Sequence, residues 1–135
     1  MDRDEILRRY AAGERNFSGL DLTGVRLSHA EIAHIDLSKT NLSKALLNGA
    51  NLHQANLSEA NLHGADLCHT NLSEANLSSA NLRAAMLVRA NLTKANLYQT
   101  NLQWASLTEV TPLDIDLSGA IASQTIIPAG YASDG

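Results

Sequence analysis

The sequence is poor in the residues that build disulfides, membrane spans and nucleic-acid grooves. Cys68 is the single cysteine, and aromatic residues make up only 4 % of the chain. One cysteine forms no intramolecular disulfide, which favours a reducing compartment. No apolar run approaches the ~18 residues of a membrane span, and the charged N-terminus lacks the apolar core of a signal peptide. The net charge of −4 comes from interspersed acids and bases, without a basic stripe for nucleic acid. We therefore expect one cytoplasmic domain without a membrane or nucleic-acid partner.

An aliphatic residue or phenylalanine returns at every fifth position from Phe17 to Leu107. These nineteen positions hold seventeen leucines, with Phe17 and Ile32 as the exceptions. A small residue tends to stand two places earlier, and Asn or Asp one place earlier. On an α-helix this period would scatter the leucines around every side, and on a straight strand it would alternate them between faces. The period instead predicts a chain that turns a corner after each unit and buries one leucine per unit.

The residues that follow each leucine support a corner. Five glycines stand two places after the leucine position, where a type II turn needs φ > 0: Gly19, Gly24, Gly49, Gly64 and Gly119. Where that place holds Lys39, Glu59 or Lys94, the sequence favours a different turn type. Serines at spacings of multiples of twenty, such as Ser38, Ser58 and Ser78, suggest four units per coil.

The run from Ala50 to Glu59, Ala-Asn-Leu-His-Gln-Ala-Asn-Leu-Ser-Glu, resembles the pentapeptide repeat family. The resemblance covers Arg15 to Ala120. It implies an all-β fold, a right-handed quadrilateral β-helix with four repeats in each of about five coils. At the ~4.8 Å spacing of neighbouring strands, such a column is on the order of 25 Å tall.

The resemblance and the breaks in the pattern divide the chain into three parts. Residues 1–14 form an expected N-terminal capping α-helix, residues 15–120 the pentapeptide repeat solenoid, and residues 121–135 a non-repeat tail. Within the first part, Asp2 or Asp4 is a candidate N-cap and Ile6, Leu7, Tyr10 and Ala11 form an apolar stripe. The stripe favours a lid on the first coil over a partner-binding or membrane-surface helix, and the short length and mixed charge of the segment argue against a membrane. The tail either folds over the last coil or makes a dimer contact, and disorder is expected for residues 133–135.

The types and spacing of the residues indicate no catalytic, cofactor or metal site. His29 and His69 lie in one column but two coils apart, roughly 10 Å, which is too far for one ion. No carboxylate is evidently placed behind His53, and a convex column lacks a pocket. We therefore expect a protein that is not an enzyme. The pairs Lys39–Glu59 and Glu74–Lys94 read as exposed ion pairs, and the Asn columns as structural amide ladders.

One side of the expected column departs from the polar pattern. Leu46 and Met86 replace the usual Asn or Asp, Cys68 and Val88 follow the buried leucine, and Trp104 stands at the corner that leads into this side. An apolar patch on a polar surface is typical of a contact site. The alternatives are that the C-terminal tail covers Met86, Val88 and Trp104 or that each residue is tolerated singly.

The family resemblance favours a non-catalytic structural or protein-interaction module, of bacterial and plausibly cyanobacterial origin. Its partner would be an unknown protein or a second copy in a homodimer. A subset of the family suggests an alternative, a DNA mimic that binds a type II topoisomerase such as gyrase, although the acids do not line one side. A second alternative is ice or carbohydrate binding by a regular hydroxyl array.

Overall fold

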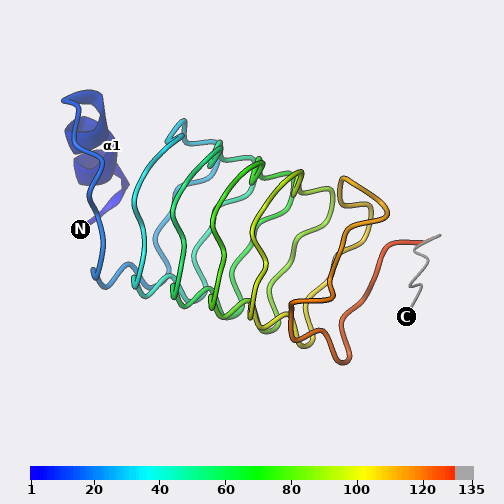
Figure 1. Ribbon diagram of the computed structural model, residues 1–135. Helices are drawn as coiled ribbons and strands as arrows, with labels where there is room; N and C mark the ends of the chain where they lie inside the picture. The colour runs from blue at the N-terminus through cyan, green and yellow to red at the C-terminus, as the bar shows by residue number, and fades with distance from the viewer. Residues whose placement is uncertain (130–135) are drawn as a thin grey trace.

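The computed structural model describes residues 1–129 and shows a single helix followed by a stack of coils (Figure 1). The helix α1 spans Arg3–Ala11, and from Asn16 onward the described chain pairs through isolated parallel bridges. No helix in this described part is long and apolar enough to cross a bilayer. The chain is thus a β-helical solenoid with a helix at its N-terminal end, as the five-residue period predicts.

The bridges fix the register of the solenoid. Each one joins residues twenty positions apart, as Asn61 does with Asn41 and Asn81, so that four five-residue units complete one coil. A unit makes three kinds of backbone hydrogen bond between coils: Leu62 N to Asn81 O at 2.7 Å, Gly64 N to Arg83 O at 3.0 Å and Asn61 N to Thr40 O at 2.9 Å. The twenty-residue coil that the serine spacing suggests is therefore confirmed.

We number four faces by their bridged columns. Face 1 carries Asn16, Asp36, Asn56, Asn76 and Asn96; face 2 carries Asp21, Asn41, Asn61, Asn81, Asn101 and Ile121; face 3 carries Arg26, Leu46, Asp66, Met86, Ser106 and Ile126; face 4 carries Glu31, Asn51, Asn71, Asn91 and Thr111. Each face also includes the three residues that follow its bridged residue in every unit.

The interior is a ladder of leucines beside small residues. Leu52, Leu57, Leu62 and Leu67, one from each face of a coil, have no exposed surface, and neither does Ala65. Burial of each leucine contributes about 1.5–3 kcal/mol.

Threonine replaces alanine inside the column at Thr40, Thr70 and Thr100. Its hydroxyl then donates to a backbone carbonyl, as from Thr70 to Leu47 O at 2.8 Å and from Thr100 to Leu77 O at 2.7 Å. Every buried polar side chain in the described residues has such a partner, which removes the cost of burying it.

The Asn and Asp residues that precede each leucine act mainly within their own unit. In Asn41, for example, Oδ1 accepts from Ser43 N at 3.1 Å, and Asn61 and Asn81 receive the same bond from the residue two places on. The contacts between stacked asparagines of neighbouring coils are longer, 3.4 Å from Asn81 to Asn61 and from Asn71 to Asn51. The structural role of the Asn columns agrees with the sequence analysis, but the local cap on the turn, rather than the amide ladder, is the stronger bond.

The corners correct one expectation. Lys39, Glu59 and Lys94 have φ of 57°, 59° and 58°, so they adopt the left-handed conformation that the sequence analysis reserved for glycine. Gly119, by contrast, does not have positive φ. At Lys39 and Glu59 the backbone N–H donates to the next coil, to Ser58 O at 2.9 Å and to Ser78 O at 3.0 Å, and these bonds hold the turn without a glycine. Propensity is overridden by tertiary structure at these positions.

The helix α1 lies against the first coil at the blue end of Figure 1. The side chain of Asp2 caps its N-terminus by accepting from Glu5 N at 3.0 Å, and Ile6 is fully buried. Arg3 donates to Ser28 O at 2.9 Å and Tyr10 to Ala33 O at 2.6 Å, which satisfies carbonyls at the open edge of the coil. Ala11 is exposed and does not belong to the buried stripe.

The C-terminal part of the solenoid extends further than the sequence analysis placed it. The rhythm breaks near Pro112, where the Thr111–Pro112 peptide bond is cis. Ile121 then pairs with Asn101 and Ile126 with Ser106, so residues 121–126 add rungs to faces 2 and 3 and are not a non-repeat tail. The expected disorder of residues 133–135 concerns positions outside the described residues.

Two adjacent serines test the strain at the corners. Ser79 has φ of 57°, whereas Ser78 is not among the positive-φ residues. Because a β-branched side chain is strongly disfavoured at positive φ, Ser79→Val should lower the free energy of unfolding by about 1–2 kcal/mol in urea titrations. Ser78→Val and Ser79→Gly should each change it by less than about 0.5 kcal/mol. Equal losses in both valine variants would contradict the left-handed corner.

Candidate interaction surface

The cluster around His53 is the nearest approach to a catalytic arrangement, and the sequence analysis missed part of it. His53 Nδ1 lies 2.7 Å from Ser73 Oγ, and Nε2 lies 3.4 Å from a carboxylate oxygen of Glu74. A carboxylate therefore does stand behind His53, because Glu74 leans diagonally across to the previous coil. Among the described residues, neither Lys39–Glu59 nor Glu74–Lys94 forms an ion pair, and Gln54 is the second contact of Glu74.

This cluster ties two coils together and does not resemble an active site. The hydroxyl of Ser73 donates to Asn71 Oδ1 at 2.6 Å, so its proton is already engaged. The side chains of His53 and Glu74 are 34 % and 43 % exposed, and water screens their interaction. Within residues 1–129, no group of three or more His, Cys, Asp or Glu side chains could hold a metal ion.

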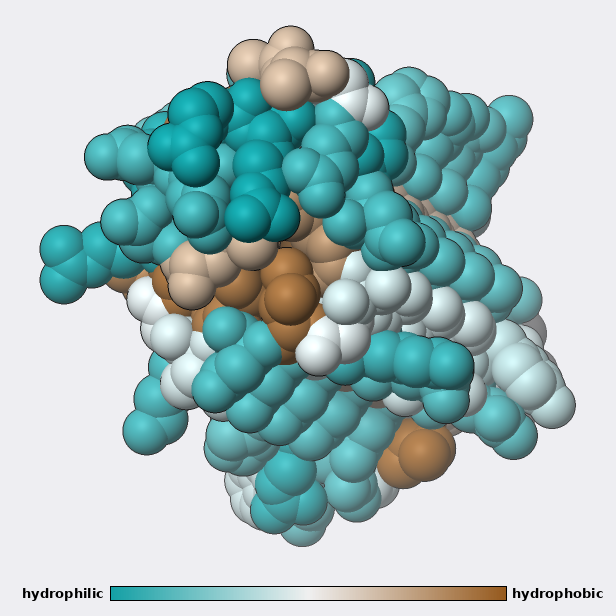
Figure 2. All heavy atoms as spheres, turned by 90° about the vertical axis from the view of Figure 1, so that its left-hand side faces the viewer, coloured by the Kyte–Doolittle hydropathy of each residue, from teal (hydrophilic) through white to brown (hydrophobic). Residues whose placement is uncertain are grey.

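A hollow of about 450 Å³ lies at the N-terminal end of the solenoid, beside the start of α1. Met1, Leu22 and Val25 line it together with charged residues of both signs, among them Asp2 and Arg26. Figure 2 looks onto this end and shows apolar side chains gathered at its centre, inside a polar rim. The hollow is the part of the first coil that α1 leaves uncovered.

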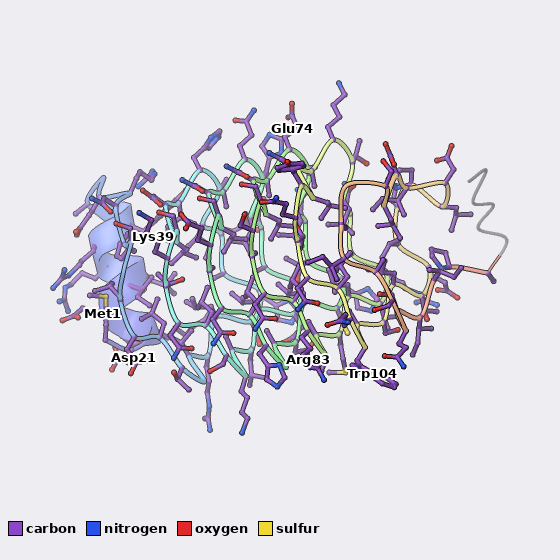
Figure 3. The ribbon with its side chains drawn as sticks, turned by 60° about the horizontal axis from the view of Figure 1, so that its bottom comes forward. Met1, Asp21, Lys39, Glu74, Arg83 and Trp104 are labelled. Carbon is purple, nitrogen blue, oxygen red and sulfur yellow. The ribbon has the colours of Figure 1, made fainter. Side chains whose placement is uncertain are left out.

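The apolar residues that interrupt the polar pattern of the sequence lie together on face 3. Leu46 and Met86 are 40 % and 47 % exposed, and both are bridged to Asp66, which lies between them. Cys68 and Val88 follow on the same face and are half-buried. Trp104, 53 % exposed, stands at the corner between faces 2 and 3. Figure 3 shows Trp104 and Arg83 on one edge of the column, away from Lys39 and Glu74.

Ile126 is a further apolar residue on this face, which the sequence analysis did not assign to it. It is 58 % exposed and continues the column of Leu46 and Met86 through Ser106. Its position, forty residues after Met86, could have identified it had the twenty-residue register been extended into the supposed tail. This segment thus lengthens face 3, and Met86 and Trp104 remain about half exposed.

The surroundings of Cys68 on face 3 shift the pKa of its thiol. Its backbone N–H donates to Asp66 Oδ1 at 3.0 Å. Burial raises the pKa of the Cys68 thiol, and a hydrogen bond of the thiol itself with the Asp66 carboxylate and the negative charge of Asp66 raise that pKa further. The thiol is therefore protonated and weakly nucleophilic at neutral pH.

Comparison with known proteins agrees with this architecture. A family model described as pentapeptide repeats matches in eight copies, over residues 15–43, 35–73 and 75–111. HetL, a pentapeptide repeat protein involved in heterocyst differentiation regulation in the cyanobacterium Nostoc sp. strain PCC 7120, is 42 % identical with a TM-score of 0.80. The match covers 82 % of this chain and 46 % of HetL, so the chain spans about half the length of that protein.

Two other solved structures are similar. The pentapeptide repeat protein alr5209 from Nostoc PCC 7120 is 33 % identical with a TM-score of 0.61, over 93 % of this chain and 95 % of that one. QnrB1, a plasmid-mediated fluoroquinolone resistance protein, is 17 % identical with a TM-score of 0.53, over 82 % of this chain and 62 % of that one, which shows a shared fold alone. No curated protein matches.

The effect of Asp66 on Cys68 can be tested by alkylation. Asp66→Asn keeps the side-chain oxygen that caps Cys68 N but removes the charge, so the pKa of the thiol should fall and more thiolate should be present at pH 8. Iodoacetamide should then modify Cys68 faster than in the parent protein. Asp36→Asn, which removes a charge from face 1, should leave the rate unchanged. An unchanged or slower rate in Asp66→Asn would contradict the assigned cause.

Proposed function

This chain belongs to the pentapeptide repeat family, and from that premise we propose that it is a non-catalytic protein-interaction module whose contact surface is face 3. The observation that carries the proposal is the exposure of Leu46, Met86 and Ile126 in one column, with Trp104 beside them. Apolar side chains exposed on one side of an otherwise polar surface are favoured where a partner removes them from water.

The chemistry of these residues fits a protein partner. Trp and Met are enriched at the centres of protein interfaces, and Trp is among the residues that contribute most to binding. The partner is either another protein or a second copy of this chain. We further propose a right-handed, four-sided winding of about five coils, capped by α1, and a cytoplasmic location, which a chain with a single cysteine suits.

The solenoid supports such a role because its backbone is held by bonds that do not depend on outward side chains. The bridged positions and the residue two places on point outward, while the leucines are buried. A partner can thus be recognised by a few replaced Asn or Asp residues on a rigid frame. Little conformational entropy is lost when a pre-organised surface binds.

Two lysines placed on face 3 test the proposal. Met86→Lys with Val88→Lys should weaken capture of the partner from a lysate of the source organism by at least tenfold, or dissociate a dimer in analytical ultracentrifugation, because the lysines add charge to an apolar contact. Ser78→Lys with Ser79→Lys adds the same charge to face 1 in a neighbouring stretch and should change neither measurement. Capture and mass that are identical in both variants and the parent protein would reject face 3.

The rival role as a DNA mimic draws support only from the shared fold with QnrB1. A mimic needs rows of carboxylates in place of phosphates, but face 1 holds Lys39 among its acids, and face 2 holds Lys44 and Arg83. A hydroxyl-array binder is also disfavoured, since the hydroxyls of Ser38, Ser58 and Ser73 donate to Asn or Asp of their own unit.

A gyrase supercoiling assay separates the DNA mimic from the interaction module. We expect micromolar protein neither to inhibit supercoiling nor to protect gyrase from a fluoroquinolone, because its carboxylates do not form a continuous row. Inhibition or protection that is lost when Asp36 and Glu59 are replaced by Asn and Gln would instead support the mimic.

A further inference from the structure

The apolar residues of face 3 have a regular spacing along the solenoid axis. Leu46, Met86 and Ile126 occur at every second rung of one column, with Asp66 and Ser106 on the rungs between them. Neighbouring rungs are separated by ~4.8 Å, the distance between hydrogen-bonded strands, so the apolar residues recur at roughly 10 Å. Three such residues therefore span on the order of 20 Å along the axis.

This spacing discriminates between the elements that a partner could lay along the face. In an extended strand, roughly 10 Å corresponds to three residues, and an odd number sends the side chains to opposite sides. In an α-helix, seven residues rise about 10.5 Å and complete nearly two turns, so residues i, i+7 and i+14 lie on one stripe. A helix parallel to the solenoid axis can thus oppose all three apolar residues at once.

The charges of the column add a second constraint. Arg26, Leu46, Asp66 and Met86 follow one another at single rungs, so the column alternates between charged and apolar side chains at its N-terminal end. One rung, ~4.8 Å, corresponds to three or four residues of a helix. A partner helix is complementary if an acidic residue faces Arg26, an apolar one Leu46, a basic one Asp66 and an apolar one Met86.

The width of the face also suits a helix. Cys68 and Val88 lie two residues beyond Asp66 and Met86 in the same rungs, and Trp104 lies at the corner on the other side. Successive outward residues of a rung are about 6.6 Å apart, so the apolar band is comparable to the ~10 Å diameter of a helix with side chains. Trp104 then stands beside the helix as an aromatic ridge.

We propose that face 3 binds an amphipathic α-helix of about fifteen residues from a partner protein, which lies along the solenoid axis with an apolar residue at every seventh position and a basic residue opposite Asp66. This inference rests on the proposed function, since it names the kind of partner that the same surface takes.

A designed peptide tests the helix directly. The probe is a synthetic helical peptide of about fifteen residues, fluorescently labelled, with leucines seven apart and one lysine midway between the first two. Binding is followed by fluorescence anisotropy and by the emission of Trp104, the single tryptophan. We expect Met86→Lys to weaken binding at least tenfold, and a control peptide of the same composition with leucines five apart to bind at least tenfold more weakly.

The lysine provides a matched control for charge. Asp66→Asn should weaken binding of the lysine peptide roughly two- to fivefold, as expected for the loss of one exposed ion pair, and should not weaken a peptide with glutamine in place of lysine. Equal binding of the two leucine spacings, or no binding of either at about 1 mM peptide, would overturn the helix inference.

The outcomes also separate this inference from the proposed function. If Met86→Lys with Val88→Lys abolishes partner capture while the peptides show no preference for seven-residue spacing, the helix is wrong and the contact surface stands. If these substitutions affect neither partner capture, the mass of the protein in solution nor peptide binding, both are wrong.

Discussion

The structure depends on a constraint on the backbone: the bridged residue of each unit pairs with residues twenty positions away in the neighbouring coils. Asn61 N donates to the coil before it, and Leu62 N and Gly64 N donate to the coil after it, so the middle of a unit is held from both sides. The chain satisfies its polar backbone groups only if it turns after every five residues. The buried leucines, the capped corners and the flat outward columns all follow from this register.

The same register separates the positions that stabilise the fold from the outward positions of the proposed contact surface. Inward positions accept few residues, because Leu and Ala fill a narrow interior, and even Thr70 needs a carbonyl partner there. Outward positions contribute less, chiefly the local cap that Asn or Asp makes with the residue two places on. Leu46 and Met86 have no side-chain oxygen that could accept this capping hydrogen bond, and they expose apolar surface. Such a loss is expected where a residue serves an interaction instead of the fold.

Much of this could be predicted from the sequence. The five-residue period excluded an ordinary helix or strand, and the serine spacing suggested the coil length that places Leu46, Cys68, Met86 and Val88 on one face. The period is informative because one missed corner would misplace every later leucine. The apolar patch could be located for the same reason, since the register fixes which outward residues are neighbours.

Other features could not be predicted because they depend on tertiary contacts. Lys39 and Glu59 adopt positive φ because neighbouring coils hold the corner, against their own preference. Glu74 lies in the coil after His53 but one position further along its unit, so an alignment of residues twenty positions apart does not pair the two side chains. The rung at Ile121 was hidden because Ala122 stands where leucine is expected, and the bridge to Asn101 establishes it. An NMR experiment that detects scalar coupling across hydrogen bonds tests the register most directly. The twenty-residue coil predicts coupling across the hydrogen bond from Leu62 N to the carbonyl carbon of Asn81. Coupling across a hydrogen bond from Leu62 N to the carbonyl carbon of any other residue would contradict this register.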